Sequence, residues 1–167
     1  MTSPLDADAR RPAGTSATVR PRTLSDAALA ALPDRELIQA VGPRLMQRVS
    51  AGTDVTEPQR LVHAAVLLHS GICNGGFEHC FRSPTWKLVP TALEAMTTLG
   101  LTAPATVVVQ ARELFQRKYS DGPPPGRGGR DRDFTMLDMD YFRCFPRGEH
   151  LFESRVTAHI RAHIEQF

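Results

Sequence analysis

Apolar residues along this chain recur mostly at intervals of three and four, which is the spacing of one side of a helix. Leu37, Val41 and Leu45 follow this spacing, and comparable stripes recur downstream, near residues 61–72, 107–115 and 152–167. No segment alternates apolar and polar residues between turn signals, as a half-buried strand would. We therefore predict an all-α fold, a compact single-domain bundle of about six to eight helices.

Capping and breaking residues place the helix ends. Ser25 is a favourable N-cap for a helix over 26–32, and Asp34 can cap a second helix that runs to about Val49. Pro43 falls inside that second helix and removes one backbone hydrogen bond, so we predict a kink or a break there. Gly100 is predicted to close another helix in the left-handed conformation. The remaining helices are predicted over 77–82, 89–99, from 102 to about 115, from a cap at Thr135 and Asp138 onward, and over 149–167.

The most apolar helix is predicted at about 57–73, after a capping box formed by Thr56 and Gln59. Apolar residues occupy most of its sides, which indicates a central helix packed by others around it. Asn74, Gly75 and Gly76 follow it directly. Two glycines inside a helix cost about 2 kcal/mol relative to alanine. Either the helix ends here in a left-handed glycine, or another element approaches the backbone closely.

Two segments lack helical periodicity. Residues 1–22 combine proline with scattered serine, alanine and arginine, and we predict a disordered tail there. Residues 120–133 are rich in proline, glycine and arginine, which predicts a flexible loop. The predicted organisation is therefore a tail over 1–22 followed by one all-α domain over 23–167, interrupted by this loop.

Composition narrows the function classes. The formal net charge is +2 for 167 residues, and the tail accounts for it, with four Arg against two Asp. The rest of the chain is neutral, which argues against a strongly basic nucleic-acid binder. Three cysteines and no signal-like N-terminus favour a reducing cytoplasm. No apolar run approaches the roughly 20 residues of a membrane span, so we expect no membrane association.

Two sets of residues have spacings that could suit a metal, but both are better explained as structural. His159 and His163 are four apart on the last predicted helix, without a third ligand nearby. His69, Cys73 and Cys80 would share a stripe only if the helix ran straight through the glycines. We therefore predict no metal and no cofactor.

Two further candidates involve charged residues. Asp138 and Asp140 are two apart, so they do not face each other on a helix, and we interpret them as acids that favour a helix start. Asp138, Asp140, Glu149 and Glu153 could together form a local acidic patch. The arginines of the tail and of the 120–133 loop could contact nucleic acid weakly, although nearby aspartates neutralise the loop.

The segment from His69 to Phe81, HSGICNGGFEHCF, and the segment from Ala92 to Gly100, ALEAMTTLG, resemble a bacterial family. It is the small all-helical family named for its founding DNA-mimic protein, and the resemblance extends over about residues 34–167. It implies a compact all-α domain in which Asn74, Gly75, Gly76 and Phe77 form a helix junction, and it implies no catalytic site. The founder imitates DNA with an acidic surface, dimerises and sequesters a DNA-binding protein. Most relatives have no known function.

We predict a non-enzymatic, cytoplasmic protein-binding module that sequesters or regulates another protein and could form a homodimer. True DNA mimicry requires a strongly negative face, which a neutral domain does not supply. An alternative is an enzyme with a site near the glycine junction, for which Glu78, His79 and Trp86 are the candidate pocket residues. Weak nucleic-acid binding through the arginines is a second alternative.

Overall fold

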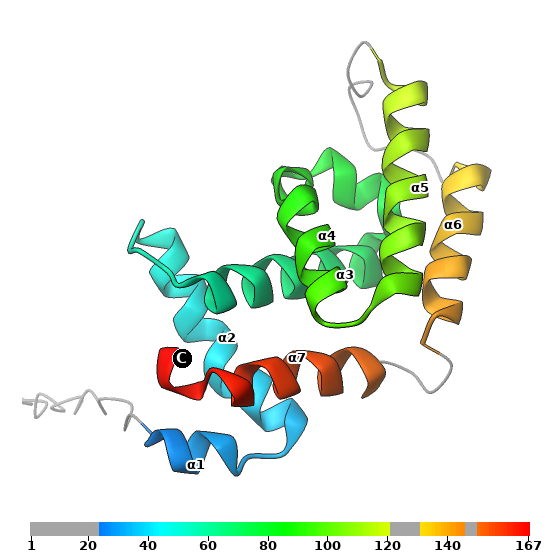
Figure 1. Ribbon diagram of the computed structural model, residues 1–167. Helices are drawn as coiled ribbons and strands as arrows, with labels where there is room; N and C mark the ends of the chain where they lie inside the picture. The colour runs from blue at the N-terminus through cyan, green and yellow to red at the C-terminus, as the bar shows by residue number, and fades with distance from the viewer. Residues whose placement is uncertain (1–23, 121–130, 146–149) are drawn as a thin grey trace, which may run out of the picture.

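The structure, a computed structural model, describes residues 24–120, 131–145 and 150–167 (Figure 1). Within these ranges all regular elements are helical, which confirms the predicted fold class and number of helices. The predicted tail and the central part of the predicted 120–133 loop lie outside the described residues. In chain order the elements are α1 (Asp26–Ala30), α2 (Asp34–Ser50), α3 (Glu57–Arg82), the 3-10 helix η1 (Pro84–Leu88), α4 (Val89–Thr98), α5 (Thr102–Lys118), α6 (Arg132–Arg143), α7 (His150–Ala162) and the 3-10 helix η2 (Ile164–Gln166).

The long helix α3 is the centre of the bundle, as predicted. Helices α2, α4, α5, α6 and α7 all pack against it. The predicted capping box is present, because the Gln59 side chain accepts a hydrogen bond from the Thr56 backbone N–H at 3.1 Å. The Gln59 amide also donates to the Gln166 carbonyl oxygen. This buried side chain therefore joins the start of α3 to the end of the chain.

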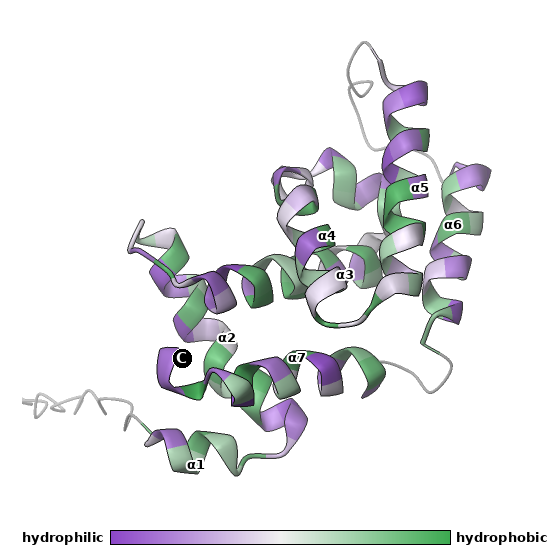
Figure 2. Ribbon diagram, in the orientation of Figure 1, coloured by the Kyte–Doolittle hydropathy of each residue, from purple (hydrophilic) through white to green (hydrophobic). Residues whose placement is uncertain are grey.

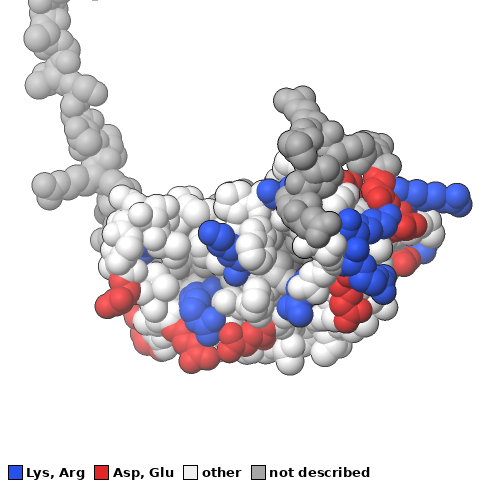
Figure 3. Space-filling model, turned by 90° about the horizontal axis from the view of Figure 1, so that it is seen from above, with Lys and Arg blue, Asp and Glu red and all other residues white. Residues whose placement is uncertain are grey.

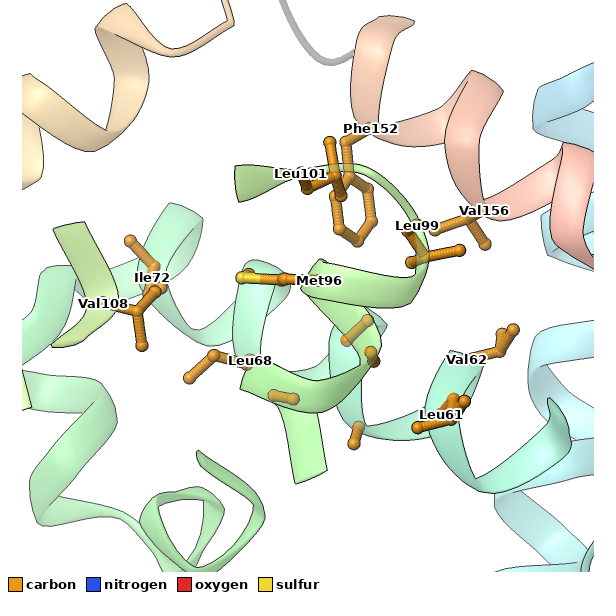
Figure 4. Close-up of a cluster of buried hydrophobic side chains, with 14 of the residues drawn as sticks. Leu61, Val62, Leu68, Ile72, Met96, Leu99, Leu101, Val108, Phe152 and Val156 are labelled. Atoms are coloured by element: carbon orange, nitrogen blue, oxygen red, sulfur yellow. The ribbon is translucent and has the colours of Figure 1, made fainter. Parts of the chain in front are cut away.

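The hydrophobic core forms where α3, α4, α5 and α7 meet (Figure 4). Leu68 and Ile72 of α3 lie beside Met96 of α4, and all three are at most 1% exposed. Burying each such side chain contributes about 1.5–3 kcal/mol. The turn that follows α4 is closed as predicted: Gly100 has φ +69°, and the Leu101 N–H donates to the Met96 carbonyl at 2.7 Å.

Of the kink or break predicted at Pro43, the break is absent, because helix α2 runs continuously from residue 34 to residue 50. Pro43 is exposed, and so is Gln39, whose carbonyl loses its helical partner. Water can therefore satisfy that carbonyl. The opposite side of α2, with Leu37, Val41 and Leu45, stays buried and holds the helix together.

Two helix ends also differ from the prediction. Helix α6 begins at Arg132, earlier than the predicted cap at Thr135, because the Asp131 carboxylate accepts from the Asp133 N–H at 2.9 Å and caps it. The last helix ends at Ala162 instead of running to Phe167. The chain leaves helical geometry at His163, with φ −132°, before the short η2.

Charged residues do not form a single-sign face in the view of Figure 3, where Lys and Arg lie among Asp and Glu and uncharged residues cover most of the surface. Several carboxylates are paired with cations, as in the 3.1 Å contact of Glu94 with Arg60 and the 2.6 Å contact of Asp131 with Lys118. Among the helices that the structure describes, none combines the length and the hydropathy that a membrane span needs.

Candidate functional site

Helix α3 bends sharply at Gly76, where φ is +74° and ψ is 177°. The bend brings Cys80 back against Gly71: a Cβ added at Gly71 would lie 3.0 Å from the Cys80 sulfur. In a straight helix nine residues would separate the two by about 13.5 Å. Both explanations offered for the glycines therefore apply, since Gly76 has a positive φ and another element also approaches it.

The approaching group is the carboxylate of Asp138 on α6. It occupies the space of a side chain at Gly76, with its Cγ 2.9 Å from where a Cβ would be. One of its oxygens accepts a hydrogen bond from the Phe77 backbone N–H at 2.8 Å. Asp138 thus caps the second half of α3 from a different helix. Burial raises the pKa of this carboxyl, and the Phe77 N–H opposes that shift only in part.

This geometry corrects the interpretation of Asp138 and Asp140 as first-turn acids. Asp138 lies in the middle of α6, and Asp140 pairs with Arg143 at 2.8 Å. Of the residues of the predicted acidic patch, Asp138 is directed at α3, where it accepts from the Phe77 N–H, and Glu153 lies 3.7 Å from His150. Glu149 lies outside the described residues.

A second polar cluster lies between α3 and α6, one turn along α6 from Asp138. The His69 Nδ1 is 2.9 Å from the Tyr141 hydroxyl, and its Nε2 is 3.6 Å from the Cys73 sulfur. The imidazole stacks on Phe152 of α7 with ring centroids 3.9 Å apart, and Phe145 meets it edge-on. The Tyr141 phenol and the Cys73 thiol therefore contact the two ring nitrogens of an imidazole that is packed among aromatic rings.

The predicted pocket residues do not converge. Glu78 is held by Arg82 at 2.8 Å and by the Tyr119 hydroxyl at 2.9 Å. His79 is exposed and lies against Gly75. Trp86, on η1, is 54% exposed. The structure therefore brings Glu78 into an ion pair and leaves the other two at the surface.

The two sets of residues whose spacing could suit a metal lie in different surroundings. The Cys80 side chain is fully buried beyond the bend of α3, where burial raises its pKa to about 11. His159 and His163 lie with ring centroids 4.5 Å apart, and the His163 ring contacts the His159 carbonyl. Across the part of the chain that the structure describes, no three His, Cys, Asp or Glu residues are arranged to hold a metal ion.

Helix α6 also presents large apolar side chains to solvent. Met136, Met139 and Phe142 are each 45–48% exposed and lie three residues apart, so they are neighbours on one side of the helix. The opposite side carries buried Phe134 and Tyr141. Hydrophobic and hydrophilic residues accordingly alternate along α6 in Figure 2. We call the exposed set, Met136, Met139 and Phe142, the α6 surface.

Sequence reasoning missed two features of this region. Asp138 is 61 residues from its partner at Phe77, and Tyr141 is 72 residues from His69. No local pattern reveals such contacts. The α6 surface did leave a signal, because Met136, Met139 and Phe142 share a spacing of three.

Comparison with known proteins identifies the family of this chain. No curated protein and no solved structure matches the chain. One family model does, described as DMP19-like protein, over residues 53–163. The match includes α3, its bend at Gly76 and α6, and DMP19 is a DNA-mimic family. Since the match extends over more than half of the sequence, the chain belongs to the DMP19-like family.

Proposed function

We propose that this chain is a non-enzymatic protein-binding module, which sequesters or regulates another protein through the α6 surface. The observation that carries the proposal is the exposure of Met136, Met139 and Phe142 on a helix whose other side is already packed in the core. Contiguous exposed apolar residues on a soluble domain are typical of interaction sites.

The composition of this surface fits a protein partner. Methionine and aromatic residues are enriched in the cores of protein interfaces, and methionine adapts its shape to an apolar partner. Charged residues of both signs border the patch: Arg132 and Asp133 at the start of α6, Asp140 and Arg143 at its end. An apolar centre with a mixed polar rim is the usual anatomy of such an interface.

The charges of both signs around the α6 surface favour an apolar contact with a partner over DNA mimicry. A DNA mimic must present carboxylates at the density of phosphates, roughly one charge per 1.7 Å of duplex axis. Here Asp140 is paired with Arg143, and Asp138 caps α3. A nucleic-acid binder would instead need a basic stripe, which a rim of both signs does not supply.

The test compares two matched methionines. Met139→Glu places a charge in the α6 surface, whereas Met46→Glu makes the same change on α2, where Met46 is similarly exposed, at 42%. The immobilised full-length chain and both variants are incubated with native cytoplasm, and eluted complexes are sized by light scattering. We expect a stoichiometric partner with the unmodified chain and Met46→Glu, and at least about tenfold weaker binding with Met139→Glu.

Other outcomes separate the alternatives. A dimer of this chain that dissociates on Met139→Glu identifies a second copy as the partner. Binding that both variants retain contradicts the α6 surface as the site, and a monomer with no stoichiometric partner contradicts the protein-binding function itself. Retention of DNA at low salt, lost when residues 1–22 are removed, would favour the nucleic-acid alternative.

A further inference from the structure

An imidazole lies beside the thiol of Cys73. Its sulfur lies 3.6 Å from the His69 Nε2, within the range of a hydrogen bond to sulfur. The Cys73 side chain is half-buried, so it remains partly accessible, whereas His69 is only 6% exposed. A thiol next to a buried base is the arrangement from which cysteine nucleophiles are formed.

The His69 imidazole, which would act as the base, is held in place by Tyr141 and Phe152. The Tyr141 hydroxyl lies 2.9 Å from the His69 Nδ1, and Phe152 stacks on the ring with an interplanar angle of 13°. Burial raises the pKa of Tyr141 far above its ordinary value, so the phenol stays protonated and neutral. When its oxygen accepts the Nδ1–H, the Nε2 lone pair faces the thiol and can take its proton.

We propose that Cys73 is a reactive thiol, activated by His69 and positioned through Tyr141, and that it is modified by small uncharged hydroperoxides. The thiol proton passes to the His69 Nε2, and the thiolate attacks one peroxide oxygen. The S–O bond forms as the O–O bond breaks, so sulfur loses two electrons and the peroxide gains them. The products are a Cys73 sulfenic acid and an alcohol or water, whose oxygen receives the proton from the His69 imidazolium.

The surroundings select this class of reagent. Phe145, Phe152 and Tyr141 around the imidazole disfavour a charged reagent, and the half-buried position of the sulfur favours a small one. Attack on a peroxide needs only a thiolate and a proton for the departing oxygen, and Cys73 with His69 supplies both. Acyl transfer would also require donors aligned on a developing oxyanion.

The other two cysteines serve as internal controls. Cys80 is fully buried, and burial raises its pKa to about 11. Cys144 is half-buried like Cys73, but it donates to the Asp140 carbonyl at 3.3 Å, and burial together with Asp140 raises its pKa. Among the described residues, the titratable groups that interact with Tyr141 beside this pair are Cys73 and Cys80 from α3 and Cys144, directly after α6. Asp138, one turn before Tyr141 on α6, is engaged with the Phe77 N–H.

The experiment treats the reduced full-length protein with hydrogen peroxide at neutral pH, traps sulfenic acid with a 1,3-dione, and quantifies the three cysteine peptides by mass spectrometry. We expect trapping at Cys73 at least about tenfold faster than at Cys144, and none at Cys80. Trapping at Cys144 as fast as at Cys73 would overturn the proposal.

Alkylation by iodoacetamide as a function of pH gives a second readout that needs no substitution. The reactivity of an ordinary thiol is half-maximal at about pH 8.5 and continues to rise above it. We expect the Cys73 rate to level off below that pH while the Cys144 rate continues to rise. Parallel profiles for the two cysteines would contradict activation by His69.

Substitution of Tyr141 by phenylalanine tests the positioning role, since it removes only the hydroxyl. We expect the Cys73 rate to fall several-fold and its pH profile to move upward, while Cys144→Ser leaves the Cys73 rate unchanged. An unchanged profile in a folded Tyr141→Phe protein contradicts the role of the phenol. If that variant does not fold, the pH profile of the unmodified protein still decides whether Cys73 is activated.

Discussion

Gly76→Ala is the substitution whose cost the geometry predicts most directly. Backbone at φ +74° and ψ 177° is essentially restricted to glycine, and strain there costs about 1–3 kcal/mol. The new Cβ would also lie 2.9 Å from the Asp138 Cγ, so the carboxylate must move away from the Phe77 N–H. Losing a hydrogen bond to a charged group costs about 1.5–3 kcal/mol. Together these terms predict a loss of about 2.5–6 kcal/mol, a large share of the roughly 5–15 kcal/mol of a typical domain.

Urea unfolding followed by circular dichroism measures this loss, and Gly42→Ala is the matched control. Gly42 is inside α2, and a Cβ there meets nothing within 4 Å. The same substitution gains about 0.5–1 kcal/mol of helix propensity, and the ring of Pro43 offsets part of this gain because it disfavours helical backbone in a preceding residue that has a Cβ. Gly42→Ala should therefore change stability by less than about 1 kcal/mol. In an Asp138→Ala background Gly76→Ala should cost less, because the carboxylate is gone and only backbone strain remains. Equal effects at the two glycines, or an unchanged cost without Asp138, would refute the reasoning.

Three further predictions concern α7 and pH. Arg161 donates to the carbonyl oxygens of Ala30, at the end of α1, and of Leu32, in the turn that follows, and to Asp34. Arg161→Ala should therefore cost about 1–2 kcal/mol in urea unfolding, whereas Arg155→Ala, at an exposed site on the same helix, should cost almost nothing. The hydrogen bond from Arg161 lowers the pKa of Asp34 below its ordinary value of 3.8. The stability that this pair contributes is therefore present above pH 3.8 and is lost as the pH falls through the folded-state pKa of Asp34. Arg161→Ala should make the unfolding free energy less dependent on pH in this acid range. Burial lowers the pKa values of His63 and His159 below 6.5, so the free energy of unfolding should fall as the pH drops below 6.5. His159→Gln should reduce that fall. An unfolding free energy that does not change with pH in this range would contradict the prediction.

The fold could be predicted because its signals are local. The spacing of Leu37, Val41 and Leu45 and the capping box at Thr56 and Gln59 each describe one helix, and the structure confirms them. A break at Pro43 does not form for a tertiary reason: Pro43 and Gln39 lie on the exposed side of α2, and the apolar side remains packed.

The candidate sites could be predicted only in part, because they depend on pairs of distant residues. The two glycines indicated an unusual backbone, but not that Asp138 would fill the space beside Gly76. The His69 and Cys73 pair was visible as a helical spacing of four, whereas Tyr141 comes from another helix. The bend of α3 carries Cys80 back against Gly71, which is why the stripe of metal ligands does not form.

The central claim, that α6 presents the binding surface, is tested most directly by oxidation footprinting of methionines in the captured complex. Met136 and Met139 belong to the α6 surface, and Met46 on α2 is an exposed internal control. We predict that the partner slows sulfoxide formation at Met136 and Met139 by at least about tenfold and leaves Met46 unchanged. Full protection of Met46 with unaltered oxidation of Met136 and Met139 would contradict the account.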